Sequence, residues 1–179
     1  MIYALYAMGP NGEFGSAIGL PWGSFSEELE FFYEFLEPFK ADIIVVGKRT
    51  YETAPKRLRE VLEKRQVLVW GRTPPTIWYN EQHRHLRYIG KGLKTYLNGS
   101  DAVIIGGAAL LEEAASQKVI DAFIRSTIEM KLCGNMWDNF PTIKLKHDDL
   151  LLWPVDSAVV VHRRGENEKY TFVSEGVYL

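Results

Sequence analysis

The chain has 179 residues with a formal net charge of −2, and 46% of its residues are apolar. This composition predicts one globular domain over residues 1–179, excludes a disordered chain, and gives no general attraction to nucleic acid. No apolar stretch reaches membrane-spanning length, no basic region precedes the first apolar run as in a signal peptide, and Cys133 is the only cysteine, so we expect a cytoplasmic protein.

The first part of the chain combines a strand, a glycine-rich loop and an acidic helix. Ile2–Met8 is a short apolar run that ends at a Gly-Pro-Asn-Gly turn, which predicts a strand. Five glycines then predict a long loop over residues 9–24. Ser26 is placed to cap a helix. The apolar residues of this expected helix recur at helical spacing, at Leu29, Phe32, Tyr33 and Leu36.

Strands and helices alternate along the rest of the chain. Compact apolar runs predict strands at residues 42–46, 67–70, 86–89 and 102–105. Helices are expected at residues 56–63, 91–97 and 108–115, whereas residues 76–85 give no prediction. Later strands are predicted at residues 119–128, 150–161 and 170–177, the last two as an antiparallel hairpin. The alternation predicts an α/β fold with an antiparallel C-terminal edge.

Glu28 is the strongest candidate for acid–base chemistry. It lies one residue before Leu29 and four before Phe32, which places it beside the expected apolar stripe. A carboxylate against apolar side chains costs free energy unless it has a partner or a task. The acidic first turn also fits an ordinary surface helix. With Trp22 nearby, an inward Glu28 is suited to bind a planar, nitrogen-rich ring and help protonate it.

Two strand-to-helix junctions indicate phosphate sites. They are Val46-Gly47-Lys48-Arg49-Thr50 and Ile104-Ile105-Gly106-Gly107-Ala108-Ala109. Each alone also fits a tight turn or a solvated surface, but together they favour a dinucleotide at the carboxyl edge of the sheet. Neither is the Gly-x-Gly-x-x-Gly fingerprint, which argues against an ordinary Rossmann dehydrogenase. No cluster has convincing metal-ligand spacing, and no serine lies on a nucleophile elbow.

Three motifs, in this order and spacing, resemble dihydrofolate reductase. They are Leu20-Pro21-Trp22 with Glu28-Leu29, the segment Val46-Gly47-Lys48-Arg49-Thr50-Tyr51-Glu52, and Val103-Ile104-Ile105-Gly106-Gly107. The resemblance is especially close to phage-encoded members, which share Gly-Leu-Pro-Trp-Gly and an Ala-Leu-Leu after the glycine pair. It implies a three-layer fold with a central eight-stranded, mostly parallel sheet, an antiparallel C-terminal strand and flanking helices.

The resemblance implies that 7,8-dihydrofolate is reduced to 5,6,7,8-tetrahydrofolate, in support of one-carbon metabolism and nucleotide synthesis. Hydride would pass from the nicotinamide of NADPH to C6 of the pterin, and N5 would take a proton. The implied catalytic residues are Glu28, which would hold the pterin, Trp22, which would order a water, and Leu20. Ser126 matches the threonine that hydrogen-bonds the acid, and Arg65 the arginine that binds the glutamate tail. The other implied substrate-binding residues are Leu5, Tyr6, Leu29, Phe32 and Ile105.

The resemblance also implies NADPH as the cofactor. Residues 9–24 match the mobile loop that closes over the nicotinamide, and Lys48, Arg49 and Arg72 would contact the 2′-phosphate. The family joins the two glycines by a cis peptide. The implied cofactor-binding residues are Ala7, Phe14, Gly15, Gly47, Lys48, Arg49, Thr50, Gly71, Arg72, Ile105, Gly106, Gly107, Ala108, Ala109 and Leu110.

Four departures from the family pattern concern rate and cofactor affinity. Leu111 stands where many members have a tyrosine, Gly71 replaces a serine, and Lys48 replaces an arginine that it does not match at a phosphate. The segment before Arg65 lacks the common Leu-Pro-Gly.

Two alternative functions stay open. A pyrimidine reductase of riboflavin synthesis shares a Gly-Arg-x-Thr-Tyr-like segment but generally lacks the Pro-Trp pair and the helix acid. A nucleotide-binding structural protein with weak catalysis fits Leu111 and Gly71. We expect dihydrofolate and antifolate inhibitors as partners, no nucleic acid, membrane or metal, and a monomer, with a dimer left open. A phage-encoded protein would act in the host cytoplasm.

Overall fold

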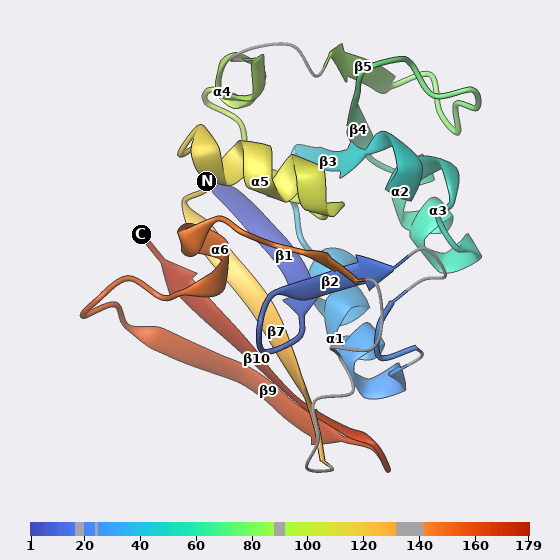
Figure 1. Ribbon diagram of the computed structural model, residues 1–179. Coiled ribbons are helices and arrows are strands. Elements are labelled where there is room, and N and C mark those ends of the chain that lie inside the picture. Colours follow the sequence, from blue (N-terminus) through green and yellow to red (C-terminus); the bar gives the residue numbers. More distant parts are fainter. Residues whose placement is uncertain (17–19, 24, 88–91, 132–141) are drawn as a thin grey trace. The chain divides into compact units, whose positions relative to one another are not determined.

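The computed structural model describes residues 1–16, 20–23, 25–87, 92–131 and 142–179 (Figure 1). The chain divides into two compact units. The first comprises Met1–Ala4 and Phe39–Asp121, and the second comprises Leu5–Pro38 and Ala122–Leu179. Strand β1 (Ile2–Met8) therefore begins in the first unit and ends in the second.

Parallel strands form the centre of the first unit. Strand β3 pairs with β4 and β6, β4 pairs with β5, and β6 pairs with the first residues of β1, all in parallel. Strands β3 and β6 are buried along their whole length, as apolar strands of a covered parallel sheet are. The elements of this unit are β3 (Ile43–Gly47), α2 (Lys48–Glu52), α3 (Lys56–Glu63), β4 (Gln66–Gly71), β5 (His83–Arg87), α4 (Gly92–Leu97), β6 (Ala102–Ile104) and α5 (Ala108–Ser116).

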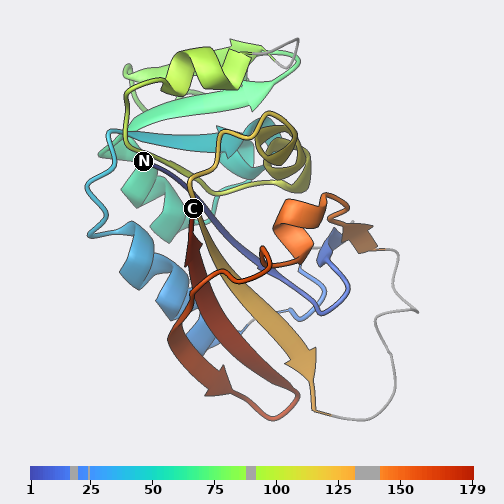
Figure 2. The same ribbon diagram turned by 90° about the vertical axis from the view of Figure 1, so that its left-hand side faces the viewer.

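Antiparallel strands dominate the second unit. Strand β10 pairs along its length with β7 and β9, the long strands that Figure 2 shows side by side. Strands β2 and β8 form a separate two-stranded sheet. The elements are β2 (Glu13–Ser16), α1 (Ser26–Leu36), β7 (Ala122–Met130), β8 (Thr142–Lys144), α6 (Asp148–Leu151), β9 (Val159–Glu166) and β10 (Tyr170–Tyr178).

The hydrogen-bonded strand order is β5-β4-β3-β6-β1-β7-β10-β9, a single eight-stranded sheet to which β1 contributes in both units. The strand pairs β1–β6, β3–β4, β3–β6 and β4–β5 are parallel, and β10 is antiparallel to both its neighbours. The predicted α/β fold, with its antiparallel C-terminal strand, is confirmed.

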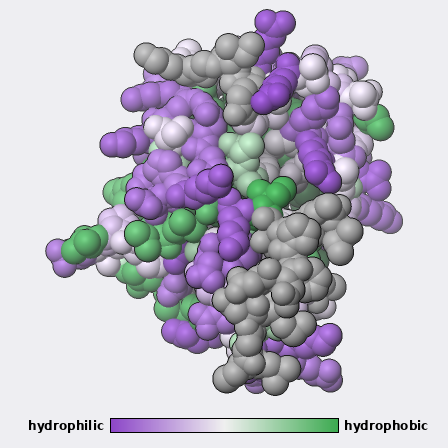
Figure 3. Space-filling view, viewed as in Figure 1, coloured by the Kyte–Doolittle hydropathy of each residue, from purple (hydrophilic) through white to green (hydrophobic). Residues whose placement is uncertain are grey.

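Strand β9 is an edge of the sheet, and apolar side chains reach the surface there and beside α6 (Figure 3). Leu152 and Val155 are exposed in the connection between α6 and β9, and Val159–Val161 are exposed on the strand itself. The second half of β9 carries charged residues, which oppose edge-to-edge association. No helix in the described part of the chain is long and apolar enough to cross a membrane.

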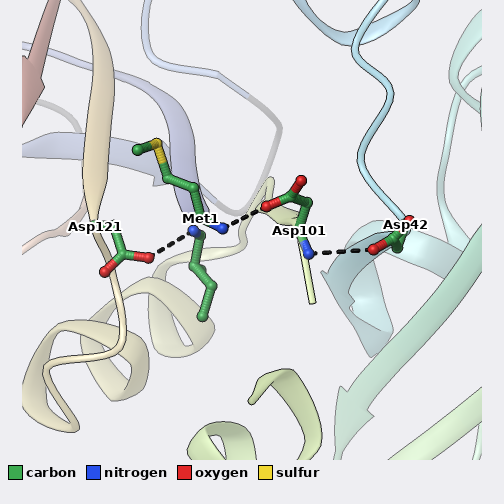
Figure 4. Close-up of polar contacts among 5 residues, drawn as sticks. Met1, Asp42, Asp101 and Asp121 are labelled. Carbon is green, nitrogen blue, oxygen red and sulfur yellow. Dashed lines mark hydrogen bonds and ion pairs between the residues drawn. The ribbon is translucent and has the colours of Figure 1, made fainter. Parts of the chain in front are cut away.

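Carboxylates fix the backbone where three strands of the first unit begin (Figure 4). Asp121 accepts a 2.8 Å hydrogen bond from the backbone N–H of Ile2, and Asp42 accepts one of 3.3 Å from that of Asp101. The Asp101 carboxylate in turn contacts the amino group of Met1. These contacts lie in segments that precede β1, β3, β6 and β7, so they support the register of the sheet.

Several predicted elements are wrong. Residues 150–161 do not form one strand, because the run Leu150–Leu152 closes the single-turn helix α6 and β9 begins only at Val159. A one-turn helix is too short to show a helical period, so its leucines look like a strand. Ser26 does not cap α1, since Phe25 is the N-cap residue and no side chain caps this end. The short elements α2, β2 and β8 were not predicted.

Candidate active site

Glu28 is buried on the inner side of α1 in the second unit. Only 7% of the residue is exposed, and the other buried residues of the helix are Phe31, Tyr33 and Leu36. The predicted stripe is therefore wrong in part, because Leu29 is 44% exposed and Phe31 is buried in its place. The inward orientation expected for Glu28 itself is found.

Burial raises the pKa of Glu28 from 4.5 to about 7, while a hydrogen bond from the Ser126 side chain lowers it. Ser126 lies on β7 and is 2% exposed. The serine hydroxyl was expected at this carboxyl, and the structure shows it there. A carboxyl group with a pKa near neutrality can hold or release a proton under physiological conditions, which is what general acid–base chemistry needs.

An aromatic cluster lies on the same side of the sheet as Glu28. Trp22 is buried with Phe25, Ile128 and Phe172, and Ala7 packs against this group. The Phe25 and Phe172 rings meet edge to face, with 5.1 Å between their centroids. Trp22 thus packs against side chains of β7 and β10, although it belongs to the glycine-rich segment.

Tyr6 lies on the opposite side of the sheet, which corrects its expected place beside the pterin. Its hydroxyl donates a 2.7 Å hydrogen bond to the carbonyl oxygen of Leu150 in α6. Successive residues of a strand point to opposite faces. Since Ala7 packs on the Trp22 side, Tyr6 points away from it and Leu5 shares the face of Ala7.

The described part of the glycine-rich loop is anchored by β8. Glu13 is fully buried, and its carboxylate accepts a 2.9 Å hydrogen bond from the backbone N–H of Asn11. Gly12 has a φ of 82°, and a side chain there would collide with the carbonyl oxygen of Leu145. Phe14 and Gly15 lie in β2, opposite β8, and Leu20 is 49% exposed. The sequence did not predict this anchor, because β8 has only three residues. The structure does not describe residues 17–19 and 24 of the expected loop, nor Cys133.

A glycine cradle lies in the first unit where β3 and β6 end. The peptide bond between Gly106 and Gly107 is cis, as the resemblance implied. The backbone N–H of Gly47 donates a 2.7 Å hydrogen bond to the carbonyl oxygen of Gly106. A Cβ at Gly47 would lie 3.1 Å from the Gly107 nitrogen, so a side chain there would press on the backbone of the glycine pair.

Gly107 is the N-cap of α5, and no side chain caps this helix end. The first N–H groups of a helix have no partner within the helix and favour an anion. Ala108 and Ala109 begin this turn, and Leu110 is buried behind it. The turn fits the pyrophosphate of a dinucleotide.

Cationic side chains lie beside this cradle in the same unit. Lys48 begins α2 directly after Gly47, and its Nζ atom donates a 2.7 Å hydrogen bond to the Thr73 hydroxyl. A Cβ at Gly71 would lie 3.0 Å from that of Lys48, which accounts for glycine at this departure from the family pattern. Arg49 and Arg72 are exposed and Thr50 is half-buried. Thr73 was not predicted, because a threonine in a Pro-rich turn carries no distinctive signal.

Arg65, in the first unit, is held by the backbone. Its guanidinium donates a hydrogen bond to the carbonyl oxygen of Phe39. A guanidinium fork oriented in this way suits a carboxylate. Ile105 is buried directly before the glycine pair, and Phe32 is half-buried on α1. Among the described residues, no group of three or more His, Cys, Asp or Glu side chains could hold a metal ion.

Comparisons with known proteins point to one family. The family model described as dihydrofolate reductase matches residues 1–171. The dihydrofolate reductase of Escherichia phage T5 is 39% identical over 136 residues, which cover 74% of this chain and 77% of the phage protein. A dihydrofolate reductase from Enterococcus faecalis, solved with NADP(H) and RAB-propyl, has the same fold with a TM-score of 0.64. It is 22% identical, and the match covers 99% of this chain and 95% of that one.

Proposed function

Because the chain belongs to the dihydrofolate reductase family, we propose that it reduces 7,8-dihydrofolate to 5,6,7,8-tetrahydrofolate with NADPH. The observation that carries the proposal is the buried Glu28 carboxyl group, whose pKa is about 7 and which accepts a hydrogen bond from Ser126. No other group of the described second unit combines burial, acidity and an adjacent aromatic cluster in this way. This buried acid also disfavours the pyrimidine reductase of riboflavin synthesis.

Glu28 holds the amino-pyrimidine edge of the pterin and favours a proton at N5. A carboxylate accepts two hydrogen bonds side by side, so it orients a ring that presents neighbouring N–H donors. Below about pH 7 the group is protonated and can supply a proton near N5. Trp22 and Leu20 border this region, and Trp22 limits access of bulk water to it.

The pterin-binding face in the second unit also includes Leu5 and Leu29. Leu5 shares the strand face of Ala7, and the exposed Leu29 is open to an incoming ring. Phe32, one turn beyond Glu28, adds a half-buried ring. We assign Arg65 in the first unit to the carboxylates of the glutamate tail, on the strength of its oriented guanidinium.

The glycine cradle of the first unit fits the pyrophosphate of NADPH, since a Cβ at Gly47 would fill the approach between β3 and the glycine pair. When bound, NADPH supplies the hydride that reduces C6 of the pterin. Gly106, Gly107 and the first turn of α5 would hold the pyrophosphate through backbone N–H groups. Lys48, Arg49 and Arg72 would bind the 2′-phosphate, and Thr73 orients Lys48 for this contact.

The nicotinamide end of the cofactor is assigned to residues of the second unit, Ala7, Phe14 and Gly15. Gly15 leaves open space where a Cβ would lie, which suits close approach of a flat ring. Ile105, Gly47, Thr50 and Gly71 complete the cofactor set in the first unit.

We further propose that residues 1–179 form a single dihydrofolate reductase-like domain, supported by the family model that matches residues 1–171. We further propose a reducing cytoplasm as the location, supported by the single cysteine of the sequence. We also propose that the protein is a monomer. Light scattering of the purified protein tests the oligomeric state.

The decisive experiment follows the near-ultraviolet absorbance of NADPH on addition of dihydrofolate. We expect turnover that requires both substrates and yields tetrahydrofolate. Absence of turnover in protein that binds NADPH would favour a nucleotide-binding protein without catalysis.

A further inference from the structure

Ser174 lies next to the acid site but is not one of the proposed substrate- or cofactor-binding residues. It is fully buried on β10, and its Oγ atom is 2.6 Å from that of Ser126 on β7. The two serines are direct partners in the antiparallel register of these strands. Both side chains therefore project to the same face, the one covered by α1. Glu28, Ser126 and Ser174 form a continuous chain of three polar side chains.

The direction of the hydrogen bonds in this chain follows from counting protons. An ionised carboxylate only accepts, so the hydrogen between Glu28 and Ser126 belongs to Ser126. A serine hydroxyl carries one hydrogen, so the hydrogen between the two serines belongs to Ser174. Ser126 thus accepts from Ser174 while it donates to Glu28.

Resting on the proposed function, we propose that Ser174 is a positioning residue for the reduction of dihydrofolate: its hydroxyl donates to Ser126 and commits the Ser126 hydrogen to the Glu28 carboxylate. Hydrogen bonds in series polarise one another in a low-dielectric interior, so the second serine strengthens the first. Without Ser174 a lone pair of the buried Ser126 hydroxyl loses its donor. Ser174 thereby stabilises the ionised form of the acid relative to the protonated form.

Other charged groups near α1 are engaged elsewhere. On β9, Arg163 pairs with Glu34, and the His162 ring packs against Phe31. Glu27 points toward Gly165 of β9. Arg125 is the neighbour of Ser126 on β7, and Glu175 is the neighbour of Ser174 on β10. Neighbouring residues of a strand point to opposite faces, so both charged side chains face away from the serines. Burial and the Ser126 hydrogen bond are the causes that set the pKa of Glu28 among the described residues.

The test is a titration of the Glu28 carboxyl carbon by ¹³C NMR in the ligand-free protein, assigned by comparison with Glu28→Gln. We expect Ser174→Ala to raise the pKa of Glu28 by about half a unit or more. Ser174→Thr keeps the hydroxyl on a residue suited to a strand, so it should keep the pKa of Glu28 at the wild-type value. Thr127→Val is the matched control: Thr127 adjoins Ser126 on β7, and its buried hydroxyl has no hydrogen-bond partner among the described residues.

A double-mutant cycle separates the relay from a general packing effect. In the Ser126→Ala background, Ser174→Ala should no longer shift the pKa, because the link to Glu28 is already gone. An unchanged pKa in Ser174→Ala, or an equal shift with and without Ser126, would overturn the positioning role. The pH profile of dihydrofolate reduction should move with the NMR value. If wild-type protein does not reduce dihydrofolate at all, the proposed function fails, and the NMR titration still decides the hydrogen-bond relay.

Discussion

Tyr6 and Arg125 donate to the same acceptor, the carbonyl oxygen of Leu150, at 2.7 and 3.2 Å. Arg125 also donates to the carbonyl oxygen of Leu151 at 2.9 Å, and its guanidinium carbon lies 3.8 Å from the centre of the Trp153 ring. These contacts tie the end of α6 to β1 and β7. Burial accordingly raises the pKa of Tyr6 and lowers that of Arg125.

Tyr6→Phe tests the face on which Tyr6 lies. Loss of one buried hydrogen bond should lower the free energy of unfolding by about 1 kcal/mol, because Leu150 keeps its bond from Arg125. The KM for dihydrofolate should stay unchanged, since the hydroxyl points away from Glu28. Urea denaturation and steady-state kinetics measure the two effects. A raised KM with unchanged stability would instead indicate that Tyr6 contacts the substrate.

Glu28→Gln should remove most of the reductase activity near neutral pH and stabilise the protein. Between pH 4.5 and about 7 the folded state binds a proton at Glu28 that the unfolded state has released, so the wild-type free energy of unfolding falls as pH rises through this range. The loss levels off above pH 7 and amounts to at most about 3 kcal/mol. The glutamine variant lacks this dependence.

Denaturation of wild type and Glu28→Gln across the pH range checks this slope, with the exposed Glu27→Gln as the matched control. In the activity assay, the wild-type rate should decline as pH rises through about 7. Full turnover in Glu28→Gln together with an inactive Glu27→Gln would mean that the wrong carboxylate has been assigned.

His83 makes the free energy of unfolding depend on pH in the direction opposite to that of Glu28. Its Nδ1 atom lies 2.7 Å from the Tyr51 hydroxyl, and its Nε2 atom 3.2 Å from the Leu62 carbonyl oxygen. Tyr51 accepts from the backbone N–H of Tyr79, so its own hydrogen is available to a neutral His83. Burial lowers the pKa of His83 below 6.5.

Below pH 6.5 the unfolded state therefore binds more protons at His83 than the folded state, and the free energy of unfolding decreases. The decrease should continue as pH falls from 6.5 toward the lower pKa of the folded state. His83→Gln should abolish this component in acid denaturation, whereas the same change at the exposed His162 should leave it in place. Identical slopes in wild type and His83→Gln would contradict the neutral, buried state.

Lys48→Ala combined with Arg49→Ala should weaken binding of NADPH far more than that of NADH. Both cations flank the cradle of the first unit, and charge-assisted hydrogen bonds to a phosphate are strong, so a loss of about tenfold or more is expected for NADPH. Fluorescence titration with both nucleotides measures the ratio. Lys56→Ala, which removes an exposed cation of α3 paired with Glu60, serves as the control. Equal losses for NADPH and NADH would exclude a 2′-phosphate site here.

Strands β3, β4, β6 and β10 were predictable because their residues form apolar runs or repeat an apolar pattern over several positions. The acid of α1 was predictable from its place in a motif. The buried apolar face of this helix was not, since Leu29 and Phe31 are both strongly apolar and only packing decides which one is buried. Elements of three to five residues, such as β8 and α2, offered no period to detect.

The residue types and the spacing of the motifs were enough to identify the family, the acid at residue 28 and the glycine cradle. These features depend on which residue types follow one another along the chain. The tertiary structure alone decided that Ser174 joins Ser126, that Tyr6 turns from the acid toward Leu150, and that Thr73 orients Lys48. Each of these contacts joins residues 25 or more positions apart, and strand register and burial set such distances, not the local sequence.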